Sequence, residues 1–152
     1  MLDTVILNIP RDQFRGIPDG KSGKSWDLYS RTGIYEKYVK NPPRGLHDGV
    51  YRPRLTGMRR FIGKGKYASF LKVEFSAPKL IFGNNLEEVA DKDFPTVIDR
   101  LQDRLLEAGV IISKLNLENA AVTAFHPSKN IVLSGGYTAS LVSRELAKIN
   151  LN

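Results

Sequence analysis

The chain has 152 residues, of which 41% are hydrophobic, and it contains no cysteine. This length is enough for one domain with its own core, and the lack of cysteine excludes disulfides, thiol catalysis and cysteine-ligated zinc. No apolar run approaches the ~20 residues that a membrane-spanning helix needs, and the first ten residues do not have the pattern of a signal peptide. We therefore expect a cytoplasmic protein with no membrane partner.

The net charge of +7 is unevenly distributed along the chain. Residues 1–72 contain 15 Lys and Arg against 6 Asp and Glu, whereas residues 73–152 contain 8 against 10. A basic excess confined to one half of a chain is typical of proteins that bind a polyanion such as nucleic acid. The alternative interpretation is a basic surface that has no partner.

The N-terminal half is predicted to consist of strands separated by a basic, loop-rich region. Residues 4–10 alternate and are rich in β-branched side chains, which predicts a strand. Residues 11–57 are rich in Gly, Pro, Lys and Arg and form the loop-rich region, with a short aromatic strand candidate at 33–41. Residues 58–76 predict a β-hairpin whose turn is "IGKGKY", and residues 78–85 are expected to be extended and apolar.

The C-terminal half is predicted to continue with a helix at 93–110, a β-hairpin at 118–134 and a helix at 138–151. From residue 66 the order is β-α-β-β-α, which is the ferredoxin-like split β-α-β plan without its last strand. We expect an α+β fold with an antiparallel sheet and two helices on one face. Because the plan lacks a strand, residues 1–152 are expected to form one domain at the N-terminus of a longer protein. An open α+β sandwich that needs no further strand is the competing prediction.

A run of cations and aromatic rings between residues 51 and 67 is the candidate nucleic-acid contact. Arg and Lys neutralise phosphates, and aromatic rings stack on unpaired bases. Tyr51 and Phe61 belong to this run, and the residues that we predict to bind DNA in it are Arg52, Arg54, Arg59, Arg60, Lys64, Lys66 and Tyr67. In the alternative, Phe61 and Tyr67 belong to the core and the cations only point to solvent.

Glu74 and His126 are the candidate metal ligands. Glu74 alternates with apolar neighbours and shares a strand face with Lys72. If His126 lay on a neighbouring strand, one oxygen and one nitrogen ligand could hold Mg²⁺ or Mn²⁺ together with water and phosphate oxygens. In the alternative, Glu74 pairs with Lys72 or a neighbouring arginine. The alternation leaves open whether the two side chains share a face, because Val122 has the same parity as His126.

Two stretches resemble one known family. "FLKVEFSAPKLIFGNN" at 70–85 and "AFHPSKNIVL" at 124–133 are similar to the filamentous-phage gene II-type rolling-circle replication initiators and their plasmid relatives. The resemblance runs from about residue 66 to residue 150, and "MLDTVILNIP" at the start is similar to the opening strand of the family. The basic region between them matches only loosely.

The resemblance implies origin-specific strand nicking and rejoining by the full-length protein. In that family a tyrosine attacks a phosphodiester with the help of Mg²⁺ or Mn²⁺, and the freed 3′-hydroxyl primes synthesis, which implies host replication proteins as further partners. The tyrosine follows the helix that is expected at 138–151, so the nucleophile is expected beyond residue 152 and this chain is expected to bind DNA without cutting it.

The resemblance also implies roles in the "HPSKN" stretch. His126 becomes a metal or phosphate contact, and Lys129 and Asn130 become phosphate contacts or turn formers. A histidine-hydrophobic-histidine motif, as in related nickases, is not present, because Pro127 and Ser128 occupy the other two positions. Two further function classes stay open, namely a non-catalytic module that binds single-stranded nucleic acid and an interaction domain whose basic loop is incidental.

Overall fold

A computed structural model describes residues 2–16, 27–31, 35–40, 49–128, 135–136 and 138–146. Eight strands lie within these ranges: β1 (Leu2–Pro10), β2 (Phe14–Arg15), β3 (Asp27–Arg31), β4 (Tyr35–Lys40), β5 (Arg54–Gly63), β6 (Lys66–Ser76), β7 (Ile111–Ile112) and β8 (Ala121–Pro127). The helices are α1 (Ala77–Phe82), α2 (Phe94–Glu107), α3 (Lys114–Glu118) and α4 (Ala139–Leu146), with 3₁₀ turns η1 (Arg11–Gln13) and η2 (Asp91–Asp93).

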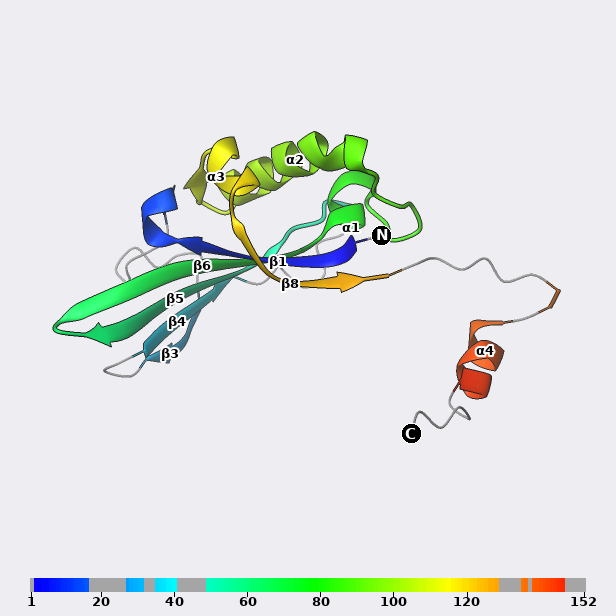
Figure 1. Cartoon of the computed structure of the whole chain (residues 1–152), viewed down its shortest axis with the longest axis horizontal. Helices are drawn as coiled ribbons and strands as arrows, with labels where there is room; N and C mark the ends of the chain where they lie inside the picture. Colours follow the sequence, from blue (N-terminus) through cyan, green and yellow to red (C-terminus); the bar gives the residue numbers. More distant parts are fainter. Residues whose placement is uncertain are drawn as a thin grey trace.

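Six of these strands form one sheet in the order β3-β4-β5-β6-β1-β8, and every neighbouring pair is antiparallel. The strands β2 and β7 form a separate two-stranded sheet. Figure 1 shows α1, α2 and α3 together on one side of the large sheet, while α4 lies apart from it. The fold is therefore a mixed α+β fold built on an antiparallel sheet, as the sequence predicted.

A split β-α-β unit lies at the centre of this arrangement. Since β6 and β8 are both antiparallel to β1, they run in the same direction, and α2 belongs to the connection between them. The strand between β6 and β8 is the N-terminal β1. In the predicted plan, this position belongs to a strand that follows β8 in the sequence. The complete ferredoxin-like plan, with two helices packed side by side on the sheet, is not confirmed by the described elements.

The core lies between the sheet and α2. Alternate residues of β1 and β6 point to the helices, and the neighbouring β5 adds Leu55. The apolar stripe of α2 closes the core from the other side, because its side chains recur at helical spacing. Fully buried members of this core are Ile9, Leu55, Leu71, Val73, Leu101, Leu105 and Val110.

Residues 78–85 were expected to be extended, and this prediction is wrong, because the helix α1 occupies Ala77–Phe82. The Ser76 hydroxyl accepts a hydrogen bond from the Lys79 backbone N–H at 3.4 Å, Pro78 stands in the first turn, and Gly83 ends the helix with φ of 75°. These are the usual start and stop signals of a helix. The apolar run of the segment hid them, because a six-residue helix is too short to show helical periodicity.

Most other predicted elements lie close to where they were expected. The strand at 4–10 is β1, the helix at 93–110 is α2, and the hairpin at 58–76 is formed by β5 and β6, although β5 begins earlier, at Arg54. The loop-rich region 11–57 contains β2, β3 and β4. The first strand of the second predicted hairpin is β8, and its second strand falls outside the described residues. No helix in the described ranges is both long and apolar enough to cross a membrane.

Candidate nucleic-acid interface

The β5–β6 hairpin extends beyond the strands on either side of it. Pairing between β4 and β5 ends at Tyr35 with Arg60, and pairing between β1 and β6 ends at Pro10 with Phe70. Residues 61–67 therefore have no described strand on either edge, and we call the outer part of the hairpin, residues 59–69, the ribbon. Figure 1 shows the ribbon projecting past the end of the rest of the sheet.

The turn at the tip of the ribbon is a tight two-residue turn. Gly63 pairs with Lys66, so Lys64 and Gly65 form the loop, with φ of 50° and 69°. Positive φ at both positions matches a type I′ turn, whose twist suits a hairpin. Lys64 is the one non-glycine residue with positive φ in the described part of the chain. Its exposed ammonium group is thus held at the outermost point of the hairpin.

An aromatic and cationic cluster lies on one face of the ribbon. Phe61 and Tyr67 are opposite each other across the strands, with ring centroids 5.3 Å apart in an edge-to-face arrangement. The Arg59 guanidinium lies over the Tyr67 ring at 4.1 Å from its centroid. Such contacts stabilise a hairpin by up to roughly 1 kcal/mol each. They hold the ribbon in one shape although Phe61 and Tyr67 remain 36% and 42% exposed.

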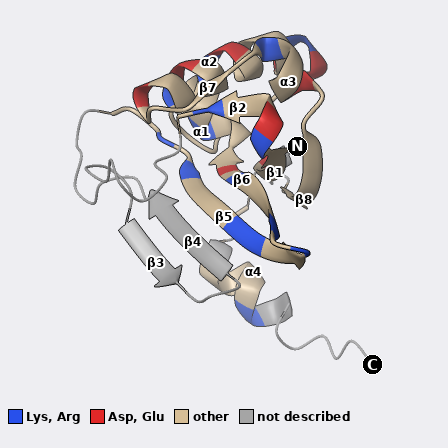
Figure 2. Cartoon of the chain, turned by 90° about the vertical axis from the view of Figure 1, so that its left-hand side faces the viewer, with Lys and Arg blue, Asp and Glu red and all other residues tan. Residues whose placement is uncertain are grey.

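Cations surround this cluster on both faces of the hairpin. Arg59 shares the face of Tyr67, whereas Arg54 and Arg60 have the opposite parity and lie on the other face. Figure 2 shows the basic residues following β5 toward the hairpin tip, while acidic residues gather on α2 and α3 at the far side of the molecule. The one carboxylate in the sequences of β5 and β6 is Glu74, at the end remote from the tip. The ribbon itself carries no acid to compete with a phosphate.

The structure thus brings Arg59, Arg60, Lys64 and Lys66 together with Tyr67 at the outer end of the hairpin, whereas Arg54 lies at the inner end, opposite Glu74. Arg54, Arg59, Arg60, Lys64 and Lys66 are all exposed on the hairpin. Arg52 precedes β5 and donates a hydrogen bond from Nη1 to the Val50 carbonyl at 3.3 Å, so it lies away from the ribbon. Lys129 and Asn130 fall outside the described residues.

Tyr51, the first ring of the predicted run, has a different environment. Its hydroxyl accepts a hydrogen bond from the Ser76 backbone N–H at 2.8 Å, and its ring packs against the core. Burial raises the pKa of Tyr51, a nearby Glu74 and Asp3 raise it further, and the hydrogen bond from Ser76 opposes them. Tyr51 is therefore a structural residue at the opposite end of β6 from the ribbon.

The candidate metal ligands Glu74 and His126 lie on one face of the sheet, on strands that flank β1. Glu74 is opposite Ile6, and His126 is opposite Thr4, two positions along β1. Two strand spacings and two residue steps separate their Cα atoms by about 12 Å. Both side chains would have to reach across β1 to share an ion at ~2.1 Å from each ligand.

Glu74 has the partner that the alternative interpretation expected. Its carboxylate lies 3.4 Å from the Lys72 ammonium, on the same face of β6. Within the described ranges, no group of three or more histidine, aspartate or glutamate side chains is placed to hold a metal ion. The metal site stays a prediction.

Sequence reasoning missed two features of the ribbon. The first is Ile62, which is 61% exposed beside the tip. The second is the stacking of Arg59 on Tyr67. The turn position alone predicts neither, because a regular two-residue loop at Lys64 and Gly65 would put Phe61 opposite Ala68. A register shift between Phe61 and Gly63 is what puts Phe61 opposite Tyr67.

Comparisons of the chain with protein-family models, with curated proteins and with solved structures give no significant match.

Proposed function

We propose that this chain binds DNA through the ribbon formed by the tips of β5 and β6. The observation that carries the proposal is a projecting two-stranded hairpin with exposed cations on both faces and no carboxylate near its tip. Cations on both faces can contact phosphates on both sides of an inserted hairpin. Each contact releases counterions from DNA, so the affinity gains an electrostatic contribution that does not depend on sequence.

The dimensions of the ribbon suit the major groove of a duplex. From Arg60 to Gly63 the strand advances three residues, or about 10 Å, and the turn extends it further. The major groove of B-DNA is about 12 Å wide and 8.5 Å deep, and it admits a two-stranded β-ribbon. The exposed side chain of Ile62 can then contact a base edge such as a thymine methyl group.

A module that binds single-stranded nucleic acid is the second candidate, favoured by the partly exposed rings of Phe61 and Tyr67. Bases stack on open ring faces. One face of Tyr67 is covered by the Arg59 guanidinium, and Phe61 and Tyr67 meet edge to face, so the two rings offer less stacking surface than their exposure implies. Duplex binding is therefore the better-supported mode.

On the basis of the resemblance to gene II-type initiators, we propose that the chain is the DNA-binding part of a protein that nicks and rejoins a DNA strand in rolling-circle replication. The nucleophilic tyrosine, a Mg²⁺ or Mn²⁺ ion and host replication proteins belong to that proposal. The split unit formed by β6, α2 and β8 supports a ferredoxin-like ancestry for the sheet.

The test compares two double variants in a salt titration of DNA binding. Arg59→Ala with Arg60→Ala should weaken binding to a labelled duplex and reduce the slope of log K against log salt by about 1.8, the value for two lost phosphate contacts. The matched control, Lys79→Ala with Arg100→Ala, removes two exposed cations from the helical layer and should leave the slope unchanged.

Three outcomes decide between the candidates. Equal slopes for both variants and the unmodified chain would remove the ribbon from the interface. Tighter binding to the single strand than to its duplex would favour the second candidate. A covalent DNA adduct formed by residues 1–152 with Mn²⁺ would contradict the expectation that this chain lacks the nucleophile.

A further inference from the structure

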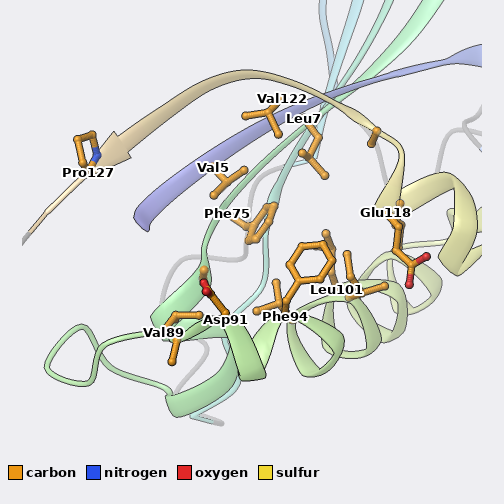
Figure 3. A pocket seen from close by; sticks show the side chains of 16 residues that line it. Val5, Leu7, Phe75, Val89, Asp91, Phe94, Leu101, Glu118, Val122 and Pro127 are labelled. Atoms are coloured by element: carbon orange, nitrogen blue, oxygen red, sulfur yellow. The ribbon is translucent and has the colours of Figure 1, made fainter. Parts of the chain in front are cut away.

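An apolar groove of about 560 Å³ lies between α2 and the strands β1 and β8, away from the ribbon. Figure 3 shows Phe94 and Leu101 of α2 on one side of the groove and Val5, Leu7 and Val122 on the other. Asp91 and Glu118 are the charged residues among those that line it. The groove is half-open, and it continues the apolar core to the surface.

The groove exists because α2 covers only part of the sheet. A helix with its side chains is about 10 Å wide, whereas the four strands from β5 to β8 span about 14 Å between their outer axes. Large apolar side chains at the rim remain in contact with solvent, with Val122 56% and Phe94 51% exposed. Such a patch is costly to leave in water and marks a docking surface.

The helix α4 has the complementary character. Leu141 and Val142 lie on one side of it, and the exposed Ser140, Ser143 and Arg144 turn elsewhere. The Thr138 hydroxyl accepts a hydrogen bond from the Leu141 backbone N–H at 3.2 Å and so caps its start. A single helix of this length is marginal in water and needs a surface to pack against. In Figure 1, α4 stands clear of the sheet and its helices.

We propose that α4 docks its Leu141 and Val142 side into the groove of its own chain. Residues 128–138 join β8 to α4. Eleven residues can span about 36 Å, which is long enough for α4 to fold back onto the groove beside β8.

The charges favour the same pairing. Residues 73–128, which supply most of the groove, contain 9 acidic and 5 basic residues, whereas residues 129–152 contain 1 and 3. With α4 in the groove, Arg144 approaches a rim that carries Asp91 and Glu118. The docked helix completes the apolar layer over β1 and β8. This inference does not depend on DNA binding, because the ribbon lies at another part of the molecule.

The test uses engineered cysteines in the full chain, whose natural sequence has none. Val122→Cys with Val142→Cys places one thiol in the groove and one on the apolar side of α4. Val122→Cys with Ser140→Cys is the matched control, because two residue steps of 100° put Ser140 on the opposite side of the helix. The linker is the same in both, so their effective concentrations match. We expect an intramolecular disulfide to form about tenfold faster in the first variant under mild oxidation at low protein concentration.

A second measurement avoids any effect of the thiols on folding. Val142→Asp should uncover the groove and raise the fluorescence of the apolar-surface dye ANS several-fold, whereas Ser140→Asp should leave it unchanged. Equal disulfide rates in the two cysteine variants, or equal dye fluorescence in the two aspartate variants, would overturn the proposal. A disulfide that links two chains in preference to one would overturn it in favour of a second copy as the occupant.

Discussion

The two halves of the β5–β6 hairpin follow the same alternation but have opposite surroundings. In the inner half, Leu55 faces Val73, and the two are 1% and 0% exposed. In the outer half, Phe61 faces Tyr67 on the same side of the sheet, and they are 36% and 42% exposed. The inner pair belongs to the core that α2 covers, whereas Figure 1 shows the outer end of the hairpin extending past the helices. Strand parity thus decides which face a side chain takes, whereas the packing of other elements decides whether that face is buried.

This difference separates the part of the hairpin that stabilises the fold from the part that we propose binds DNA. The inner half contributes buried apolar surface to the core, and the outer half presents cations on a stiffened ribbon. Where the helical cover ends, Arg59 occupies the face that carries Leu55 and Leu71 nearer the core, and it covers Tyr67. We expect substitutions in the inner half to change folding and those in the outer half to change DNA affinity.

The largest expected effect is on stability, at the inner end. Leu101 on α2 is fully buried against the sheet, so Leu101→Ala should lower the free energy of unfolding by about 2–5 kcal/mol through lost burial and a residual cavity. Urea denaturation measures this change. Ile62→Ala on the ribbon is the control, and it should stay within about 0.5 kcal/mol because Ile62 is largely exposed. Similar losses for the two variants would mean that the ribbon is packed in solution.

Tyr51→Phe should have an intermediate effect that depends on pH. Losing the hydroxyl that accepts the Ser76 N–H should cost about 1 kcal/mol at pH 7. Folding raises the pKa of Tyr51 above its ordinary value near 10. The stability that the neutral hydroxyl contributes is therefore fully present below pH 10 and is lost as pH rises through the raised pKa.

Urea denaturation of Tyr51→Phe and the unmodified chain at pH 7 and above pH 10 checks this expectation. The stability difference between the two should shrink at the higher pH, because only the unmodified chain releases a proton from residue 51 on unfolding. Other tyrosines and lysines titrate in both proteins and cancel in the difference. A difference that stays constant with pH would place Tyr51 in a solvated environment.

Much of the sheet and of the ribbon was predictable from local sequence. The clean alternation at "SFLKVEFS" gave the faces of residues 71–75 in β6, and the two glycines around Lys64 gave the turn. The stripe and the early proline of "DFPTVIDRLQDRLLEAGV" gave α2. These elements are long or carry a strong local signal, which is why pattern reasoning succeeds there.

The features that the sequence did not predict depend on contacts between segments that are distant in the sequence. The pairing of β1 between β6 and β8 has no local signature, since a strand sequence does not specify its neighbours. The same limit applies to Glu74 and His126, whose shared face follows only from their common pairing with β1. The burial of Tyr51 depends on Ser76, 25 residues away, so it could not be separated from the exposed rings of the run.

The smallest expected effect is at the turn, where stability and binding should move in opposite directions. Lys64 holds φ of 50°, a left-handed conformation that is strained for lysine and favourable for asparagine in a type I′ turn. Lys64→Asn should therefore stabilise the fold by up to about 1 kcal/mol, and it should reduce the salt slope of DNA binding by about 0.9 if its ammonium contacts a phosphate. Lys66→Asn removes the same charge from a β position, where asparagine is disfavoured, so it should lower the slope without any gain in stability. Thermal unfolding and salt-dependent anisotropy on both variants check the pair. A loss of stability in Lys64→Asn equal to that in Lys66→Asn would show that the tip does not form the tight turn on which the shape of the ribbon depends.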